Sequence, residues 1–245
     1  MDRFFSTPES WREGQVQLAG DEAHHCRRVM RKGVGDEIEV FDGNGQWGRG
    51  AIVEEEDGTV SVELREEGRS VRRLPGITLA VAIPKGKTME LIVQKAVELG
   101  VSAIQPLVTE HTVVRVEGEE AEKKRGKWQR VALEACKQCG QNVLPEVFGV
   151  GSLETWIASR EGGRCGLMAS LAAGAVTLRE ATSELPESLA ELDLLVGPEG
   201  DFSEEETAVA IEGGFQPMSL GEMTMRVETA VMFALSVLGY ELWLE

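Results

Sequence analysis

Basic residues are in short supply in this 245-residue sequence: 25 Lys and Arg stand against 42 Asp and Glu, a formal net charge of −17 at pH 7. The shortage begins early, because residues 1–73 hold 11 basic and 16 acidic residues. Proteins that bind nucleic acid usually carry a basic surplus. The deficit excludes a broadly basic binding surface, so contact with a polyanion requires a local basic patch within an unfavourable overall field.

Long hydrophobic runs and cysteines are also scarce. No stretch approaches the roughly 18 to 20 apolar residues that a membrane helix needs, and the opening MDRFFSTPES has no basic-then-apolar signal pattern. Four cysteines without such a signal favour reduced thiols over a disulfide framework. We therefore expect a cytoplasmic protein that does not contact a membrane.

Sets of metal-binding and phosphate-binding residues are incomplete. Cys136 and Cys139 form a CxxC, but no second CxxC completes a four-ligand zinc site, and both fall on the apolar stripe of a predicted helix. His24-His25-Cys26 is likewise short of ligands. Gly86-Lys87-Thr88 lacks the glycine that a phosphate loop needs five positions earlier, where Val81 stands. We predict no metal site and no nucleoside triphosphatase.

A change of pattern near residue 73 predicts two domains. Before it, short segments rich in β-branched residues are separated by turn signals such as Asp42-Gly43 and Asn44-Gly45. One helix is predicted to start near Asp21 and to end before Gly33. A compact β-barrel is the natural way to close such strands, so residues 1–73 are predicted to form a small barrel domain. The predicted strands are 37–41, 51–53 and 60–64.

After Leu74-Pro75-Gly76, predicted strands alternate with predicted helices. This alternation is typical of an α/β domain with a largely parallel sheet, which we assign to residues 74–245. The predicted strands are 77–83, 101–108, 192–196 and 217–220, and the predicted helices are 89–99 and 127–140, with one more after each of the last two strands.

Two glycine-containing loops follow predicted strands in the last third of the chain. In LDLLVGPEGDFSEEE, Gly197 and Gly200 permit close approach by a ligand, and the loop ends in a predicted capping box of Ser203 and Glu206. Ligands bind α/β sheets at the carboxyl ends of the strands. The loop therefore predicts either a ligand site or a purely structural turn.

The same order of elements recurs in FQPMSLGEMTMRVETAVMFALSVLGY. A loop follows Leu220-Gly221, and Arg226 and Glu228 stand at the start of a helix that is predicted to end near Gly239. A structural salt bridge or helix cap is the alternative to a functional pair. The helix is apolar nearly all round, which predicts burial on more than one side, in a subunit interface or a deep core.

A basic cluster lies in the predicted helix near the start of the chain. His24, Arg27, Arg28 and Arg31 follow i, i+3, i+4 and i+7 spacing, which places them on one side of an α-helix. Such a face is either simply solvated or a contact for nucleic-acid phosphates.

Several segments, in sequence order, resemble the RsmE-type methyltransferases of the SPOUT superfamily, which methylate N3 of uracil in small-subunit (16S) ribosomal RNA. The segments are KGKTMELIVQKAVELGV, WQRVALEACKQCGQNVLPEV, LLVGPEGDFSEEE and SLGEMTMRVETA. The opening DRFF and HHCRRVMRKGVGDEIEVFDG resemble the N-terminal PUA-like β-barrel of that family. The resemblance spans nearly the whole chain. It implies a C-terminal α/β domain with a trefoil-knotted parallel sheet, and a homodimer packed through the knot helices.

The resemblance also implies S-adenosylmethionine as the methyl donor and ribosomal RNA, or the small ribosomal subunit, as the partner. Arg226 would stabilise the charge that forms on the uracil carbonyl oxygens when N3 loses its proton. Glu228 would act as the base or orient Arg226, and we favour orientation because a carboxylate beside an arginine is a weak base. The implied donor-binding residues are Leu195, Gly197, Glu199, Gly200, Leu220, Gly221, Met225 and Arg226, and the expected RNA contacts are Arg3, Arg27, Arg28, Arg31 and Lys32.

Three positions depart from the family pattern, which has arginine where this chain has His111, Gln141 and Met223. Their loss would weaken a grip on phosphates and fits the acidic composition. The alternatives are another knotted RNA methyltransferase, acting on a different base or a ribose hydroxyl, and an RNA-binding or ribosome-assembly protein with little or no catalysis. A small-molecule α/β enzyme would suit the charge but leaves the barrel unexplained.

Overall fold

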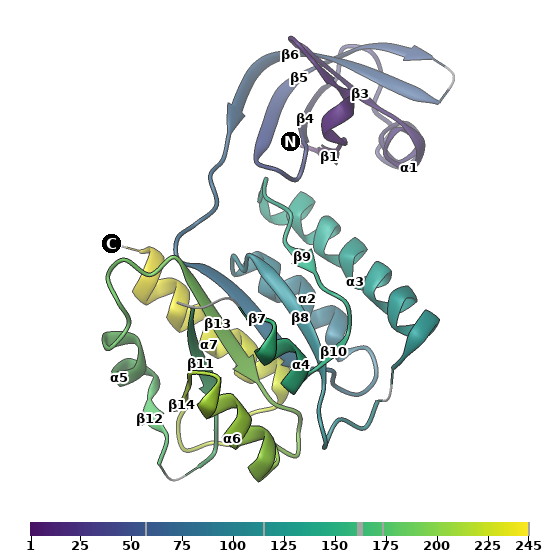
Figure 1. Cartoon of the computed structure of the whole chain (residues 1–245). Coiled ribbons are helices and arrows are strands. Elements are labelled where there is room, and N and C mark those ends of the chain that lie inside the picture. The colour runs from purple at the N-terminus through teal and green to yellow at the C-terminus, as the bar shows by residue number, and fades with distance from the viewer. Residues whose placement is uncertain (57, 115, 161–163, 173, 245) are drawn as a thin grey trace. The chain divides into compact units, whose positions relative to one another are not determined.

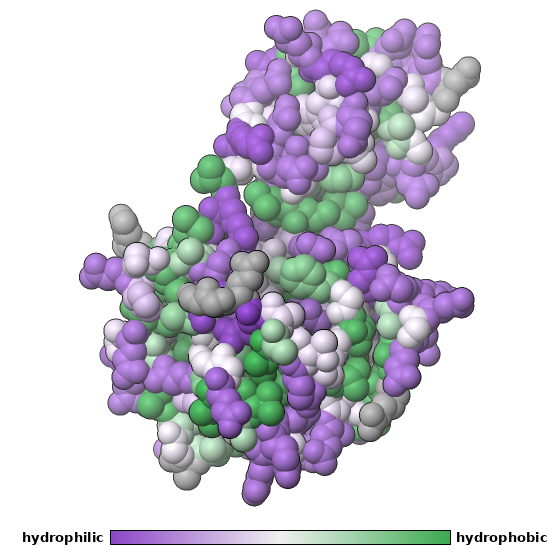
Figure 2. Space-filling view, viewed as in Figure 1, coloured by the Kyte–Doolittle hydropathy of each residue, from purple (hydrophilic) through white to green (hydrophobic). Residues whose placement is uncertain are grey.

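A computed structural model describes residues 1–56, 58–114, 116–160, 164–172 and 174–244, and the structural statements below concern these residues. The chain divides into two compact units (Figure 1). The first unit is Met1–Arg72 with Cys136–Leu144, and the second is Arg73–Ala135 with Pro145–Glu245. On the face drawn in Figure 2, hydrophilic side chains cover most of both units, with smaller hydrophobic areas among them.

The first unit is built on a six-stranded curled sheet with the order β1-β4-β5-β6-β3-β2. Strand β1 pairs with β4 in parallel, and the other pairs are antiparallel. Alternate residues of β3 are buried, as expected for a strand with one face on a core. The strands are β1 Arg3–Phe5, β2 Trp11–Arg12, β3 Gln15–Leu18, β4 Glu37–Phe41, β5 Gln46–Glu56 and β6 Thr59–Arg69, and a short 3-10 turn, η1, spans Pro8–Ser10.

The helix predicted from Asp21 to before Gly33 is shorter and less regular than expected. Helix α1 spans Gly20–His24 and continues as a single π-helical turn, η2, over His25–Val29. The N–H of Met30 donates to the carbonyl of His25 at 2.9 Å, an i to i−5 bond, and Arg31 has a left-handed φ of 55°. The expected common face of His24, Arg27, Arg28 and Arg31 was wrong, because the wider turn changes the spacing and Arg31 lies beyond the helix.

Residues 136–144 complete the first unit from a distant part of the sequence. The Arg3 guanidinium donates to the carbonyl of Cys136 at 2.7 Å and also to the side chain of Asn142. The N–H of Leu144 donates to the carbonyl of Gly43 at 2.8 Å. A single domain boundary near residue 73 therefore leaves residues 136–144 outside the unit to which they belong.

The second unit contains an eight-stranded sheet in which every described pair is parallel. The order is β10-β8-β7-β13-β11-β14-β12, and β9 also pairs with β8. This confirms the predicted α/β class with a parallel sheet. The strands are β7 Gly76–Ala82, β8 Ala103–Val108, β9 Glu146–Val147, β10 Gly151–Ser152, β11 Cys165–Ala169, β12 Val176–Thr177, β13 Glu191–Val196 and β14 Phe215–Ser219.

Helices cover both faces of this sheet, with α2 packed beside α7 on one face and α4 beside α6 on the other (Figure 1). All seven residues of β7 are buried, as expected for a parallel strand covered on both sides. No helix among the described residues is long and apolar enough to cross a membrane. The helices are α2 Thr88–Glu98, α3 Gly118–Cys139, α4 Leu153–Ala158, α5 Leu178–Ser183, α6 Glu204–Glu212 and α7 Val227–Trp243.

Candidate functional site

Three neighbouring strands end at one edge of the parallel sheet and create a pocket there. Strand β11 lies between β13 and β14, with Met168 opposite Leu195 and Ala169 opposite Met218. The loops that follow these strands therefore leave the sheet side by side, and they surround an open pocket whose empty space, including open solvent, is about 580 Å³. It is lined by Ala169, Ser170, Leu171, Val196, Gly197, Pro198, Glu199, Asp201, Leu220, Gly221, Met223, Thr224, Met225, Val227 and Ala230.

The loop after β13 is folded tightly against the core. The N–H of Asp201 donates to the carbonyl of Pro198 at 3.0 Å, and Asp201 has a left-handed φ of 60°. The buried Phe202 ring lies under Gly197, where a Cβ would come within 3.0 Å of a ring carbon. A larger residue at position 197 would displace either the ring or the pocket wall.

The predicted capping box at the end of this loop is confirmed. The Ser203 hydroxyl accepts from the N–H of Glu206 at 3.3 Å, and the Glu206 carboxylate accepts from the N–H of Ser203 at 3.0 Å. The second Glu206 oxygen accepts from the N–H of Glu110 at 2.8 Å. Glu206 is buried, and its carboxylate has the hydrogen-bond partners that a buried charge needs, because it accepts from backbone N–H groups of two different loops.

The loop after β14 forms the opposite wall. Gly221 has a φ of 120°, a conformation that favours glycine, and its N–H donates to the Ser219 hydroxyl at 3.2 Å. Met223, one of the positions expected to carry arginine, lines the pocket and is 78% exposed. The wall therefore offers the pocket backbone groups and thioether side chains.

Arg226 caps the start of α7 with its backbone, and its side chain is exposed. The side chain makes no capping hydrogen bond, and no ion pair or hydrogen bond joins Arg226 to Glu228 among the described residues. Among the described residues, the Arg226 side chain therefore takes part in neither of the structural alternatives, the salt bridge and the helix cap. Glu228 is half-buried in the first turn of α7, where a negative charge suits the helix dipole.

The expected donor-binding residues fall into two groups. Five of them line the pocket: Gly197, Glu199, Leu220, Gly221 and Met225. The other three do not. Leu195 is fully buried in the core beneath α4 and α6, Gly200 packs against His111, and Arg226 lies between the lining residues Met225 and Val227.

Sequence reasoning missed the third wall, Ala169, Ser170 and Leu171. This wall follows β11, a strand that was not predicted. Gly174, in the loop that follows this strand, is the signal that could have identified it.

The residues expected to contact RNA differ in whether another side chain already pairs with them. Arg3 is not available as a surface cation, because its guanidinium donates to Glu39 at 2.6 Å and its side chain is 9% exposed. Arg27 pairs with Glu55 at 2.8 Å. Lys32 pairs with Asp2 at 2.7 Å, and this contact raises the pKa of Lys32 and lowers that of Asp2.

Arg28 and Arg31 are the members of this set that stay exposed, and neither has a hydrogen bond or ion pair within the described parts of the chain. Gln141, the second position without the expected arginine, donates from its side chain to the carbonyl of Val143 at 3.0 Å. Of the five basic residues expected to contact RNA, Arg28 and Arg31 are therefore the two that are exposed and unpaired within the described residues.

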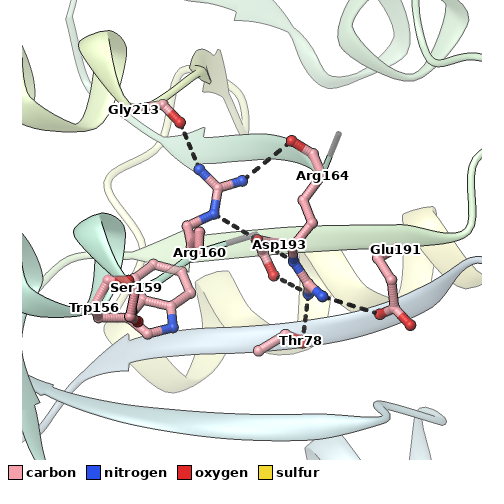
Figure 3. A network of polar contacts seen from close by, with 8 residues as sticks. All are labelled: Thr78, Trp156, Ser159, Arg160, Arg164, Glu191, Asp193 and Gly213. Carbon is pink, nitrogen blue, oxygen red and sulfur yellow. Dashed lines mark hydrogen bonds and ion pairs between the residues drawn. The ribbon is translucent and has the colours of Figure 1, made fainter. Parts of the chain in front are cut away.

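A second polar cluster, on the α4 and α6 face of the sheet, consists of groups that satisfy one another (Figure 3). Asp193 is 1% exposed and accepts from Arg160 at 2.7 Å and from Arg164 at 2.9 Å. Arg160 also donates to the carbonyl of Gly213 at 2.6 Å, and its guanidinium lies 4.1 Å from the centre of the Phe215 ring. We interpret this cluster as a structural network rather than a ligand site.

The cysteines are free thiols in different surroundings. Burial raises the pKa of Cys26 to about 11 and that of Cys136 to about 12, which disfavours the reactive thiolate. Cys139 is exposed, so its expected place on the apolar stripe was wrong, because α3 ends at this residue. Within the described residues, no group of three or more His, Cys, Asp and Glu side chains is placed to hold a metal ion.

Helix α7 has apolar side chains on two sides. Its inner face, which includes Val231 and Leu235, is buried in the second unit. On the outer face, Phe233 and Tyr240 are 41% and 66% exposed and line an open groove together with Met232 and Val237. Within a single chain, α7 is therefore buried on one side and not, as the sequence had predicted, on more than one.

Comparison with known proteins finds two family models. The model of an RNA methyltransferase domain matches residues 72–239, and that of an RNA methyltransferase PUA domain matches residues 18–65. A relative from Synechocystis, named ribosomal RNA small subunit methyltransferase E, is 34% identical over 238 residues, which cover 96% of this chain and 76% of the relative.

Two solved structures are similar over nearly their full length. One is ribosomal RNA small subunit methyltransferase E from Neisseria gonorrhoeae bound to S-adenosylmethionine, with a TM-score of 0.87, 31% identity, and coverage of 99% of this chain and 98% of that one. The other is a putative methyltransferase from Legionella pneumophila in complex with the same cofactor, with a TM-score of 0.85, 32% identity and 96% coverage of both chains.

Proposed function

The chain belongs to the family of RNA methyltransferases whose members include ribosomal RNA small subunit methyltransferase E, and we propose that it methylates N3 of a uridine in small-subunit (16S) ribosomal RNA. The methyl donor is S-adenosylmethionine, as in the two similar structures. The observation that carries the proposal is the pocket enclosed by three loops at the carboxyl edge of the parallel sheet.

The pocket suits this donor chemically. Gly197 and Gly221 leave backbone groups accessible, Leu220 and Met225 offer apolar surface, and Glu199 and Asp201 bring carboxylates to a ligand that carries positive charge. When bound, S-adenosylmethionine supplies a methyl group activated by its sulfonium. We propose that the protein holds the donor mainly through the loops after β13 and β14, and that the chain passes through a trefoil knot at this site.

Arg226 is the residue we propose to act on the RNA base. Loss of the N3 proton places negative charge on the two flanking carbonyl oxygens of uracil, and a guanidinium is a permanent cation with donors in a planar fork. The exposed side chain of Arg226 has no hydrogen bond or ion pair with the described residues, and its neighbours Met225 and Val227 line the donor pocket. The guanidinium is therefore available to stabilise that charge beside the methyl donor.

Glu228 is the proposed partner of Arg226. It stands two residues further along α7, and we propose that it orients the guanidinium when RNA binds. A carboxylate that accepts hydrogen bonds from a guanidinium uses its lone pairs in that contact, so we favour orientation over proton abstraction.

We further propose that residues 1–73 contact the RNA while residues 74–245 hold the donor and perform the transfer. Arg28 and Arg31 are the principal proposed RNA contacts, because no acidic side chain among the described residues pairs with them. The outer face of α7, with Phe233 and Tyr240, is proposed to bind a second copy in a homodimer, since apolar side chains there line an open groove. A cytoplasmic location follows from a ribosomal RNA substrate.

Mass mapping of small-subunit ribosomal RNA from a strain that lacks the gene tests the activity. We expect one methyl group to disappear from N3 of a uridine and to return when the gene is restored. Loss of a methyl group from another base or from a ribose would instead favour a different knotted RNA methyltransferase. An unchanged methylation pattern would favour an assembly role without catalysis.

A further inference from the structure

A rigid turn stands behind the donor pocket, immediately after β8. The hydroxyls of Thr109 and Thr112 are 2.8 Å apart, and the Thr112 hydroxyl also accepts from the N–H of Thr109 at 3.0 Å. The N–H of Thr112 donates to the carbonyl of Thr109 at 3.1 Å, and both threonines are buried. The two residues between them, Glu110 and His111, are therefore held in a fixed conformation.

This turn contacts the donor loop at two points. The Nδ1 atom of His111 lies 2.9 Å from the carbonyl oxygen of Asp201, and the N–H of Glu110 donates to the buried Glu206 at 2.8 Å. The first contact reaches the residue with left-handed φ, and the second reaches the first turn of α6. The segment from Asp201 to Glu206 is thus attached at both ends to one turn that lies about 90 residues earlier in the sequence.

His111 also packs directly against the back of the loop. A Cβ on Gly200 would come within 3.2 Å of the His111 Cβ, so the histidine side chain covers the Gly200 backbone. The neighbours Glu199 and Asp201 line the pocket, whereas Gly200 does not. The loop therefore faces the donor site with one side and His111 with the other.

The chemistry of this contact fixes the position of a proton. A carbonyl oxygen is only an acceptor, so His111 must carry a proton on Nδ1, which both the imidazolium and one neutral tautomer do. The Nε2 atom takes no part in this contact. An asparagine side chain can place an amide nitrogen near the position of Nδ1, whereas glutamine places one near that of Nε2.

We propose that His111 is a positioning residue for the methyl donor: its Nδ1–H bond to the Asp201 carbonyl holds the Pro198–Asp201 turn in its binding shape. The inference rests on the proposed function, because it takes the pocket to be the donor site. His111 touches neither the donor nor the base in this account. Its effect is to preform the wall, which lowers the ordering cost when the donor binds.

Calorimetry with S-adenosylmethionine on the full chain tests this proposal. We expect His111→Gln and His111→Leu to raise the dissociation constant about 3- to 10-fold, the range for loss of one hydrogen bond. His111→Asn should recover most of the affinity. His24→Gln, at an exposed position in the first unit, is the matched control and should bind the donor like the wild type.

The pattern of the variants separates positioning from general stability. We expect the KM for the donor to rise in His111→Gln while kcat at saturating donor and the free energy of unfolding at pH 8.5 stay near wild-type values. Equal donor affinity in all three His111 variants and the wild type, or equal losses in the Asn and Gln variants, would overturn the inference while leaving the proposed function intact. A wild-type protein that fails to bind the donor would overturn both.

Discussion

Strand β13 carries a closed polar network near its start and an open ligand pocket at its end. On the α4 and α6 face of the sheet, Asp193 accepts hydrogen bonds from Arg160 and Arg164, which also donate to backbone carbonyls and to the hydroxyl of Thr78. Three residues further along β13, Val196 lines the ligand pocket. Beside this pocket, the Arg226 side chain has no ion pair or hydrogen bond with the described residues. Charged residues that satisfy one another stabilise a fold, whereas those left unsatisfied at an edge are available to a substrate.

The largest effect on stability is expected from a substitution of Asp193 in the closed polar network. Asp193→Asn leaves Arg160 and Arg164 without their shared carboxylate in a buried site, so we expect the free energy of unfolding to fall by about 3–5 kcal/mol. Urea denaturation measures the change. Arg65→Ala removes an exposed pair with Glu37 and is the control, with an expected loss of less than about 1 kcal/mol. A loss at Asp193 no larger than this control would contradict the structural interpretation of the network.

The opposite pattern is expected at Arg226. Arg226→Ala should lower the rate of methyl transfer about 10²- to 10³-fold, the effect of removing one donor that stabilises developing negative charge. The dissociation constant of S-adenosylmethionine and the free energy of unfolding should stay near wild-type values, because the side chain makes no capping bond. Single-turnover transfer to ribosomal RNA and calorimetry measure the two effects. Unchanged transfer would remove Arg226 from the mechanism.

A smaller effect is expected for the basic patch of the first unit. Reversing the charge of either Arg28 or Arg31 to Glu should weaken RNA binding and lower the slope of log affinity against log salt by about 1. The same change at Arg65 is the matched control, because Glu37 already neutralises that side chain. Filter binding at several salt concentrations distinguishes them. Equal effects from the patch and the control would show that only overall charge matters.

The smallest effect concerns the pH dependence of the contact behind the donor loop. The bond to the Asp201 carbonyl raises the pKa of His111 above its ordinary value of 6.5, and nearby Glu110 and Glu206 act in the same direction. The raised pKa adds stability that is fully present below pH 6.5 and is lost as the pH rises through the folded-state pKa. The stability advantage of the wild type over His111→Asn should therefore be larger at pH 5.5 than at pH 8.5. An advantage that grows with pH would contradict this assignment.

The sequence predicted most elements whose pattern is local. Strand β4 has the predicted bounds, β7 and β13 begin one residue early, and the capping box of Ser203 and Glu206 is present. Strand β11 was missed, and its place in the sheet is set by β13 and β14, which lie on either side of it and come later in the sequence. Its loop supplies the unpredicted wall of the pocket.

Helix lengths were less predictable, because polar and terminal turns lack an apolar stripe. Helix α3 begins at Gly118 rather than 127, and its first turns carry ion pairs such as Lys124 with Glu120 and Arg125 with Glu122. Helix α7 runs past Gly239 to Trp243, whose ring N–H donates to the carbonyl of Pro75 at 3.1 Å. Such long-range contacts determine where a helix ends.

The roles of arginines were the least predictable feature of the candidate site. The sequence does not distinguish Arg3 from Arg28. In the fold, however, Arg3 donates hydrogen bonds to Glu39 and to residues 136–144, while the Arg28 side chain is exposed. Nothing in the local sequence around Arg160 and Arg164 indicates that they form the most buried charged network described. The partner of a charged residue decides its role, and that partner is remote in sequence.

The most direct test of the central claim is complementation of a strain that lacks the gene, with mass spectrometry of methylation at uridine N3 in small-subunit ribosomal RNA. Wild-type protein is predicted to restore the methyl group, and Arg226→Ala, present in the cell at the same level, is predicted to leave the site unmethylated. Full methylation by Arg226→Ala would contradict the proposal that the pocket and Arg226 beside it form the catalytic centre.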